Sequence, residues 1–395
     1  MLSKAYSAID RGQVSLLGLL DLSAAFDTVD HEILLSRLSS TYGLAGPVHA
    51  WMSSFLSDRS QIVSFEGSTS WCSALNCGVP QGSVLGPLLF VLYTAEVSAI
   101  AQRWDLFIHA YADDIQLLGS TTAKDTAHLC SRFANCISEI EGWMAANFLK
   151  LNSEKTQFLW LGTRQQLSKI HTDSIIINSA SIKIDNQATD LGVILDNQLS
   201  LLPHIRNVSK SCFFQLRQLW SIRRRITPSV AKGLAQAFVC CRIDYCNSSL
   251  YGATGKNLWH LQSILHTAAR MVTGRRKFDH ITPVLRDELH WLPVAQRIDF
   301  KLCTLTYKCL HGMAPAHLSS MCVPTASDQF RSRLRSAPRG DLIIPATRTA
   351  LGSRSFASAG PRTWNELPVE LRDSSLSLDR FRGNLKAHFF KIAYL

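Results

Sequence analysis

Two adjacent carboxylates, Asp113 and Asp114, stand in the stretch "HAYADDIQLLG" between apolar flanks. The flanks, residues 107–108 and 115–118, predict two short strands with the acidic pair at the turn between them. One interpretation is a simple turn, because aspartate favours turns and tolerates their backbone angles. The other is a divalent cation site, since carboxylate and phosphate oxygens are the ligands that Mg²⁺ prefers.

A third carboxylate, Asp21, ends the apolar run that begins at Val14. The run predicts a buried strand, at whose end an unpaired carboxylate is costly. If Asp21 lies beside Asp113 and Asp114, the three charges repel one another and raise at least one pKa. Two Mg²⁺ ions about 3.5–4 Å apart would offset that repulsion and hold both oxygens of an in-line phosphoryl displacement. These three residues are therefore the candidate metal ligands, with Mn²⁺ as a possible substitute for Mg²⁺.

The surrounding pattern predicts the elements that must position these residues. Strands joined by hairpins alternate with helices before Pro203, and helical periodicity dominates after it. This pattern favours an α+β fold with an antiparallel sheet backed by helices. The expected strands are 14–20, 61–65, 71–76, 175–177, 182–184 and 191–195, and the expected helices are 31–40, one after Pro47, one from about Pro87, 122–146, and three near 228–246, 255–273 and 294–311.

Composition narrows the class of protein. The chain has 395 residues, 46% of them hydrophobic, which is typical of a globular protein with a sizeable core. No apolar run is long enough to span a bilayer, so we expect no membrane partner. The eleven cysteines include no C-x-x-C pair, which argues against a zinc site and favours a reducing, intracellular compartment, nuclear or cytoplasmic.

Charge is divided unevenly along the chain. Residues 1–200 hold 12 Lys or Arg and 19 Asp or Glu, whereas residues 201–395 hold 29 and 11. The acidic half suits metal ions, and the basic half suits phosphate. A basic surface that serves only solubility remains the alternative.

Five motifs in order give the chain a family resemblance. "DLSAAFD", "GVPQGSVLGPLLF", "YADD", "LKLNSEKTQFLWLG" and "LGVILDNQLS" together resemble the reverse transcriptase of non-LTR retrotransposons (LINE elements), in particular the jockey-like branch. "YADD" alone is a weak signal, but the ordered set is specific. The likeness covers residues 1–200 firmly, and "RSFASAGPRTWNELPVELR" is similar to the C-terminal end of such elements.

The resemblance implies roles for individual residues. Asp21 would bind metal and Leu22 would lend a backbone carbonyl, while Asp113 would be the stronger metal ligand and Asp114 the weaker. The nucleotide and the primer would be handled by other residues. These are Phe26 as a steric gate against a ribose 2′-hydroxyl, Gln81 and Gly82 at the incoming nucleotide and template base, Lys155 as a proton donor to pyrophosphate, and Leu191 with Gly192 in the primer grip.

Each of these residues also has a purely structural interpretation. Phe26 could be a core aromatic, Gln81 and Gly82 a turn before a helix, and Lys155 a solvated surface lysine. The run 223–225, three arginines, could touch the backbone of a primer–template duplex or face water.

The resemblance also implies a domain plan. It gives a right-hand polymerase palm over residues 1–200, a helical thumb over 203–275 and a basic region of unknown role over 276–395. Only twenty residues precede Asp21, so a fingers segment and an N-terminal endonuclease domain are expected to be missing.

Three functions remain open at this stage. The first is an RNA-directed DNA polymerase that takes an RNA template, a DNA primer and deoxynucleoside triphosphates. The second is a truncated, catalytically inactive element copy that at most binds nucleic acid. The third, an intron-encoded polymerase, is disfavoured by "DLSAAFDTVDHEILLSRL" and by the C-terminal segment.

Overall fold

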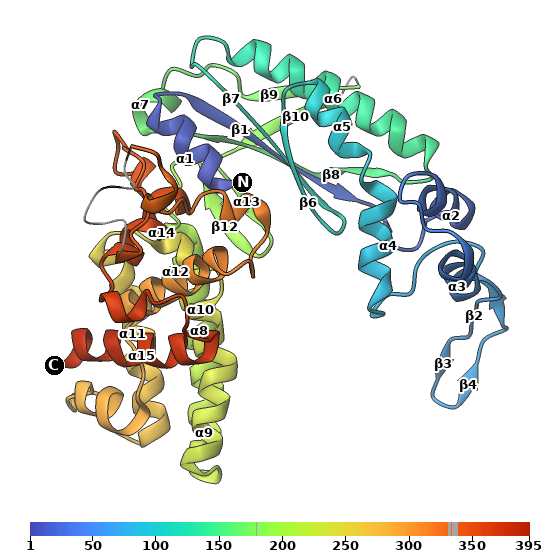
Figure 1. The fold of residues 1–395 in the computed structure, drawn as a ribbon. Helices are drawn as coiled ribbons and strands as arrows, with labels where there is room; N and C mark the ends of the chain where they lie inside the picture. The colour runs from blue at the N-terminus through green and yellow to red at the C-terminus, as the bar shows by residue number, and fades with distance from the viewer. Residues whose placement is uncertain (179, 331–332, 334–338) are drawn as a thin grey trace. The chain divides into compact units, whose positions relative to one another are not determined.

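The computed structural model describes residues 1–395 apart from residues 179, 331–332 and 334–338. The chain forms two compact units (Figure 1). Unit 1 contains residues 12–191 and Met1, and unit 2 contains residues 2–11 and 192–395. The boundary between the units falls between Leu191 and Gly192. The change from strands to helices comes between the last strand, β12 (Val193–Asp196), and α8 (Leu202–Ile222), close to the Pro203 at which it was expected.

Unit 1 is built around a six-stranded sheet in the order β6-β7-β1-β8-β10-β9. Its central strand, β1, is buried along almost its whole length because both of its faces are apolar. The strands are β1 (Val14–Leu22), β6 (Phe107–Tyr111), β7 (Asp114–Thr121), β8 (Leu151–Leu161), β9 (Ser174–Ile177) and β10 (Ala180–Asp185).

The sheet is antiparallel at every pairing but one. β1 runs antiparallel to β7 and to β8, and β6 runs antiparallel to β7. β8 and β10, however, pair in parallel. The expected antiparallel sheet is therefore correct for the strands that carry the acidic residues and wrong at this pairing, because the segment after β8 crosses over before it returns.

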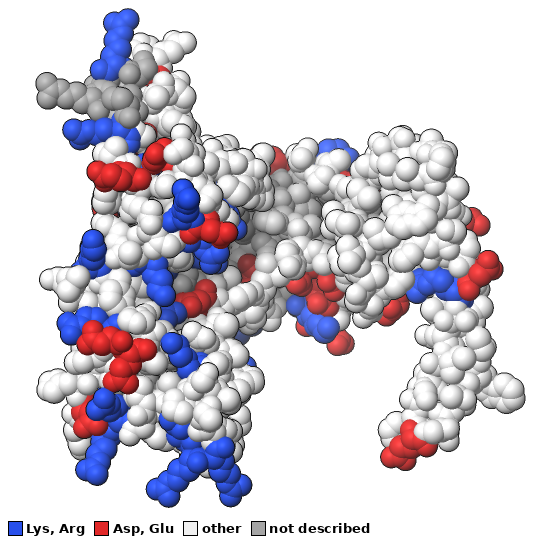
Figure 2. Space-filling model, turned by 60° about the horizontal axis from the view of Figure 1, so that its bottom comes forward, with Lys and Arg blue, Asp and Glu red and all other residues white. Residues whose placement is uncertain are grey.

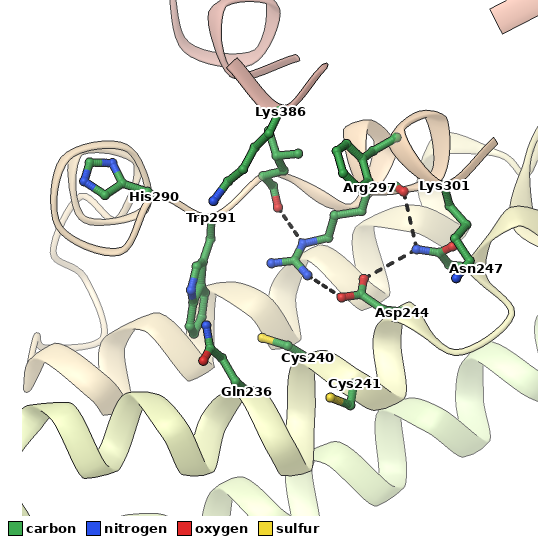
Figure 3. A pocket seen from close by; sticks show the side chains of 12 residues that line it. Gln236, Cys240, Cys241, Asp244, Asn247, His290, Trp291, Arg297, Lys301 and Lys386 are labelled. Carbon is green, nitrogen blue, oxygen red and sulfur yellow. Dashed lines mark hydrogen bonds and ion pairs between the residues drawn. The ribbon is translucent and has the colours of Figure 1, made fainter. Parts of the chain in front are cut away.

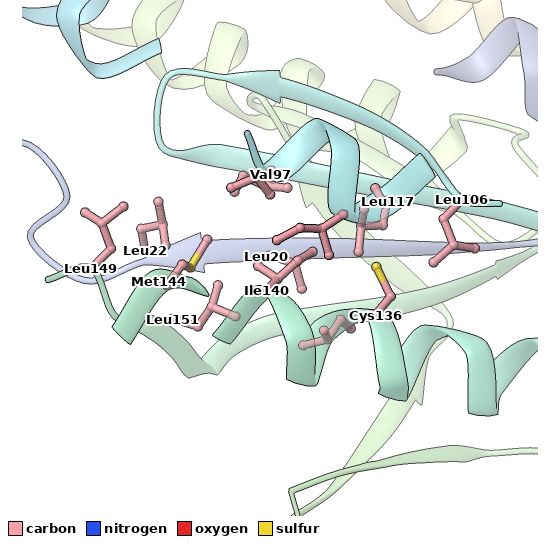
Figure 4. Packing of buried hydrophobic residues seen from close by; sticks show 14 of the residues in the cluster. Leu20, Leu22, Val97, Leu106, Leu117, Cys136, Ile140, Met144, Leu149 and Leu151 are labelled. Atoms are coloured by element: carbon pink, nitrogen blue, oxygen red, sulfur yellow. The ribbon is translucent and has the colours of Figure 1, made fainter. Parts of the chain in front are cut away.

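One face of this sheet is covered by helices. Leu20 and Leu22 of β1 and Leu117 of β7 pack against Cys136 and Ile140 of helix α6 (Figure 4). The helices of unit 1 are α2 (His31–Ser40), α3 (Gly46–Leu56), α4 (Leu85–Thr94), α5 (Val97–Arg103), α6 (Thr126–Ala146) and α7 (Arg164–Leu167). The expected α+β architecture is confirmed.

Local sequence signals set several boundaries in unit 1. Asp30 caps α2 by accepting a hydrogen bond from the Ile33 amide at 2.8 Å. Residues 60–74 form one interrupted hairpin instead of two continuous strands, since β2 (Ser60–Gln61) pairs with β5 (Ser73–Ala74) and β3 (Ser64–Phe65) pairs with β4 (Ser68–Thr69). The strand expected at 191–195 is also wrong in detail: β11 (Gln187–Asp190) and β12 (Val193–Asp196) flank Leu191 and Gly192, which have positive φ angles of 45° and 79°.

Unit 2 is almost entirely helical. The helices near 228–246, 255–273 and 294–311 are confirmed, although the first is divided by a π-helical turn. The helices are α1 (Leu2–Asp10), α8 (Leu202–Ile222), α9 (Pro228–Ala235), α10 (Cys241–Asp244), α11 (Gly255–Thr273), α12 (Val294–Leu310), α13 (Ala316–Ser319), α14 (Phe356–Asn365) and α15 (Leu378–Tyr394), with the π-helical turns η2 (Gln236–Cys240) and η4 (Val284–Leu289) and the 3₁₀ turns η1 (Arg223–Arg225), η3 (Asn247–Leu250), η5 (Thr325–Ser327), η7 (Gly352–Arg354) and η8 (Val369–Leu371).

The C-terminal segment, for which the sequence suggested no physical role, organises unit 2. α14 and α15 supply Trp364, Phe381 and Leu385 to a core that also contains Tyr307 of α12. Arg354 donates hydrogen bonds to the backbone carbonyls of Leu199, Tyr251 and Ser249, at 2.7, 3.0 and 3.3 Å. One side chain thus joins three segments far apart in sequence.

Helix α1 is attached to the same C-terminal segment. Asp10 accepts hydrogen bonds from the backbone amides of Arg348 and Thr349 and from the Thr349 hydroxyl. These bonds hold the pKa of Asp10 below its usual value despite an opposing contribution from burial. The first helix therefore belongs structurally to unit 2.

One stretch of the described chain, Leu85–Arg103, is long and apolar enough to cross a membrane by length and composition alone. It consists of α4 and α5, separated by a turn. Leu89, Phe90 and Ile100 of this stretch belong to the core of unit 1, as expected for the helices of a globular core.

Candidate active site

The acidic pair lies at the tip of a hairpin, as the sequence predicted. Tyr111 of β6 pairs with Asp114 of β7, which leaves Ala112 and Asp113 as a two-residue turn. Ala112 has a φ of 53°, which is uncommon for a residue other than glycine. Such strain is typical of functional sites.

Strand register brings Asp21 to the same place. In the β1–β7 pairing Leu20 lies opposite Ile115, so the next step of the register places Asp21 opposite Asp114. Directly opposed residues on adjacent antiparallel strands lie on the same face, with Cα atoms about 4.5–5.5 Å apart. Since Leu20 and Leu22 face α6, alternation directs Asp21 to the other face of the sheet.

Asp21 is incompletely satisfied in this position. Its side chain is 28% exposed, yet its Oδ2 atom is buried and accepts no hydrogen bond within the described part of the chain. The cation near it is Lys155 of β8, whose Nζ lies 3.4 Å from Oδ2. Lys155 is itself 68% exposed, so it can move away when another cation arrives.

The pKa of Asp114 agrees with a site in which the acidic residues lie close together. Burial, and then the nearby charges of Asp113 and Asp21, raise the pKa of Asp114 above its usual value. Asp114 therefore feels the charge of both other candidate ligands, as the sequence argument predicted for at least one of the three.

A cavity of about 90 Å³ opens at this point on unit 1. Asp21, Asp114 and Lys155 line it together with Leu191. Asp113, at the hairpin tip, is not among the lining residues within the described chain.

Two lining residues were missed at the sequence level. Asp190, at the end of β11, accepts a hydrogen bond from the amide nitrogen of Gln116 on β7. Burial, followed by the charge of Asp114, raises the pKa of Asp190 to about 6. Gln116 is 4% exposed and lies two residues after Asp114 on the same face of β7. A polar residue inside the apolar run 115–118 was the available signal.

The remaining predicted residues of unit 1 lie elsewhere. Gln81 and Gly82 are exposed, and Gln81 donates a hydrogen bond to Asp27 at 3.0 Å. Phe26 packs on the core, with its ring centroid 4.9 Å from that of Phe90, and Leu22 is buried at the end of β1. Among the described residues that line the cavity, none of these four is found; their nucleotide contacts stay predictions.

The arginine run of unit 2 has two different environments. Arg223 donates hydrogen bonds to the carbonyls of Met271 and Val272, both at 2.7 Å, so it ties α8 to the end of α11. Arg224 and Arg225 are exposed and remain available to a phosphate backbone. Figure 2 shows lysine and arginine side chains spread over unit 2, whereas the face of unit 1 in the same view shows few.

The donor chemistry of the cavity fits a divalent cation. Its acidic oxygens are hard ligands, and the buried Oδ2 of Asp21, which has the Lys155 ammonium nearby but accepts no hydrogen bond from the described residues, is an atom that a metal cation would satisfy. No group of three or more His, Cys, Asp or Glu side chains in the described chain is already arranged around a metal position. Binding would therefore require the carboxylates to turn toward a common point.

Comparison with known proteins agrees with this geometry. Residues 4–194 match the family model described as reverse transcriptase (RNA-dependent DNA polymerase). The chain is 29% identical over 276 residues to a probable RNA-directed DNA polymerase from transposon BS of Drosophila melanogaster, covering 68% of this chain and 30% of that protein. It is 26% identical over 228 residues to the RNA-directed DNA polymerase from mobile element jockey of the same species, covering 56% and 24%. The chain thus spans about a third or less of the length of these relatives.

Solved structures give a distant likeness. The apo telomerase of Candida tropicalis is similar over 69% of this chain and 45% of its own, with a TM-score of 0.38 and 12% identity. The first four motifs, the six-stranded sheet that carries the acidic residues and the family match all fall within the first 194 residues. Residues 4–194 are a reverse transcriptase domain of the type found in non-LTR retrotransposons.

Proposed function

We propose that the chain is an RNA-directed DNA polymerase that extends a DNA primer on an RNA template by nucleotidyl transfer. The observation that carries the proposal is the meeting of Asp21 and Asp114 on one face of the sheet, with a buried Asp21 oxygen that accepts no hydrogen bond from the described residues. The family match supports a divalent metal requirement, and the all-oxygen donor set favours Mg²⁺, as two ions, over softer metals.

Each acidic residue then has a defined task. Asp21 and Asp113 would hold the cations, with Asp114 as the weaker ligand because burial and its neighbours raise its pKa. The bound cations would supply Lewis-acid stabilisation of the charge that develops on the reacting oxygens. Lys155, 3.4 Å from Asp21, would be close enough to give a proton to the departing pyrophosphate.

Substrate positioning would fall to residues outside the cavity. Gln81 and Gly82 are exposed and would contact the incoming deoxynucleoside triphosphate and the template base, once Gln81 exchanges its hydrogen bond to Asp27 for the substrate. Phe26 lies five residues after Asp21 and would act as the gate against a ribose hydroxyl, with the Leu22 carbonyl beside it. The turn at Leu191 and Gly192 would hold the primer end, and residues 203–275 would act as the thumb on the duplex.

The alternative is a relic that binds nucleic acid without catalysis. The excess of Lys and Arg in residues 201–395 favours phosphate binding whether or not the acidic cavity works. The two functions share a fold and differ in a single measurable property, the divalent-dependent incorporation of nucleotides.

The decisive experiment is primer extension by the purified chain on a primed RNA template, with and without Mg²⁺. We expect incorporation by the wild type and its loss in Asp113→Asn. Asp58→Asn is the matched control, because Asp58 is exposed at a positive φ of 53° that asparagine tolerates. Wild-type protein that binds the duplex but incorporates no nucleotide would refute the polymerase and leave the relic.

A further inference from the structure

Unit 2 contains a second cavity that the polymerase reaction does not use. It has a volume of about 420 Å³, within the range of small-molecule sites. Figure 3 shows its walls: Trp291 and Lys386 lie on one side, and Asp244, Arg297 and Lys301 on the other. Its floor comes from the π-helical turn η2 and from α10.

Two polar groups in this wall lack partners. The side chains of Trp291 and Asn247 are 4% and 3% exposed. The Trp291 indole nitrogen and the Asn247 Oδ1 atom are both buried without a hydrogen bond among the described residues. A buried polar group without a partner costs about 1–3 kcal/mol. Two of the side chains that line the cavity therefore hold one unused donor and one unused acceptor, both just beneath its surface.

The charge at the cavity is positive. Arg297 is neutralised by Asp244, with Nη1 2.6 Å from Oδ2. Lys301 and Lys386 are exposed and make no ion pair with any described residue. The two free ammonium groups suit an anionic ligand that carries a phosphate.

The backbone around the cavity is irregular in the way of binding sites. η2 supplies Gln236 and Cys240 to the lining, and a second π-helical turn, η4, ends immediately before His290. π-helical turns are rare and are found frequently at functional sites. Here two of them border the same cavity.

We propose that this cavity binds a single nucleotide, with its base against Trp291 and Asn247 and its phosphate at Lys301 and Lys386. A base offers both acceptors and donors on its edge, which the indole N–H and the amide oxygen can pair with, and its aromatic ring suits the apolar part of the wall. The nucleotide can come from two sources, a free mononucleotide or an unpaired residue of a single strand. A base within a duplex is excluded unless it is extruded, because stacking holds it. The site goes beyond the proposed polymerase activity. It uses no residue of the acidic cavity, although part of its lining, residues 236–247, belongs to the segment proposed as the thumb.

The chain carries its own reporter for occupancy. Cys241 is exposed and lines the cavity, whereas Cys72 is exposed in unit 1. The full chain is treated with iodoacetamide, and the alkylation of each thiol is followed by mass spectrometry. The probes are uridine monophosphate, a twelve-residue oligouridylate, an abasic ribose-phosphate oligomer of equal length, and an RNA duplex.

We expect the alkylation of Cys241 to slow about five-fold or more at saturating nucleotide, while that of Cys72 is unchanged. Protection by the monophosphate identifies the free nucleotide as a sufficient ligand, and protection by the oligouridylate alone identifies a single strand as the source. Both outcomes support the site. It is overturned if neither probe protects Cys241, or if the abasic oligomer or the duplex protects it equally well.

Paired variants distinguish binding by the cavity lysines from the general effect of positive charge on unit 2. The double variant Lys301→Gln/Lys386→Gln is compared with Arg382→Gln/Lys391→Gln, which removes the same charge from exposed positions of α15. We expect the first to weaken oligouridylate binding about ten-fold or more and to lower its salt slope by about 1.4, the value for two lost phosphate contacts on a single strand. An equal loss in the control would overturn the proposal. Trp291→Phe, which keeps the ring but removes the N–H, should reduce protection while leaving duplex binding unchanged.

Because the footprint and the binding measurements need no incorporation, their failure is distinct from that of the polymerase. A protein that extends primers but leaves Cys241 unprotected has the polymerase function without this site. A protein that protects Cys241 but incorporates no nucleotide has the site without the polymerase function.

Discussion

Replacing Lys155 by glutamine should strengthen divalent cation binding even though it removes a candidate catalytic group. In the structure the Lys155 ammonium lies near the buried Asp21 oxygen, which accepts no hydrogen bond from the described chain. A metal ion that binds Asp21 must displace this ammonium. Glutamine is similar in length but uncharged, so the competition disappears.

The magnitude follows from the distance and the exposure. Two unit charges 3.4 Å apart interact by roughly 1.2 kcal/mol at the dielectric constant of water and by more near a protein surface. Lys155 is 68% exposed, and ion pairs with such exposure contribute about 0.2–1 kcal/mol when measured. A value of about 0.5–1 kcal/mol corresponds to a two- to five-fold tighter affinity for the cation.

The assay is a titration with Mn²⁺ followed by electron paramagnetic resonance, without nucleotide or primer. Lys183→Gln is the control, because Lys183 is exposed on β10 and does not line the cavity within the described chain. Unchanged or weaker Mn²⁺ binding by Lys155→Gln would refute the competition, and an equal gain in the control would assign the effect to net charge. The same Lys155→Gln protein should extend primers more slowly than the wild type if Lys155 protonates pyrophosphate.

Two further predictions concern unit 2. Arg354→Ala should destabilise the unit by about 3 kcal/mol, because it removes three hydrogen bonds to backbone carbonyls at about 1 kcal/mol each. Chemical denaturation should show this loss. A change as small as that of the exposed control Arg382→Ala would show that Arg354 does not hold these segments together. Asp299→Asn should stabilise unit 2 above pH 6, since burial and then Glu366 raise the pKa of Asp299 from 3.8 to about 6. Ionising the buried carboxylate is unfavourable in the folded state, so the free energy of unfolding of the wild type falls as pH rises from about 4 to about 6. Thermal unfolding should show the variant more stable than the wild type by at most about 3 kcal/mol at pH 8, and equally stable below pH 4. A constant difference across this pH range would refute the assignment.

Local pattern was sufficient for most elements of unit 1. The helix 31–40 has the predicted bounds because an aspartate cap and an apolar stripe act within a few residues of each other. The hairpin of "YADD" followed from two apolar flanks and a turn-forming pair. The parallel pairing of β8 with β10 had no such signal, because it depends on a crossover between segments separated in sequence.

The C-terminal segment shows the opposite case. Residues 313–395 have few clear periods, and α14 and α15 were not predicted there. Their stability comes from packing Trp364 and Phe381 against Tyr307 of α12, which no window of local sequence contains. A short helix gains most of its stability from such tertiary contacts.

The sequence by itself predicted that Asp21, Asp113 and Asp114 belong together, because the ordered motifs and the ends of two apolar strands mark them without reference to any contact, and the structure places Asp21 and Asp114 in one cavity. Only the tertiary structure decided that Asp190 and Gln116 share the cavity of Asp21 and Asp114, and that Trp291 and Asn247, which hold unpaired polar atoms, line a second one. The physical reason is the separation of the interacting residues along the sequence. Strand and turn propensities act over a few residues, whereas burial, strand register and the hydrogen bonding of a polar atom depend on partners that only the folded chain brings together.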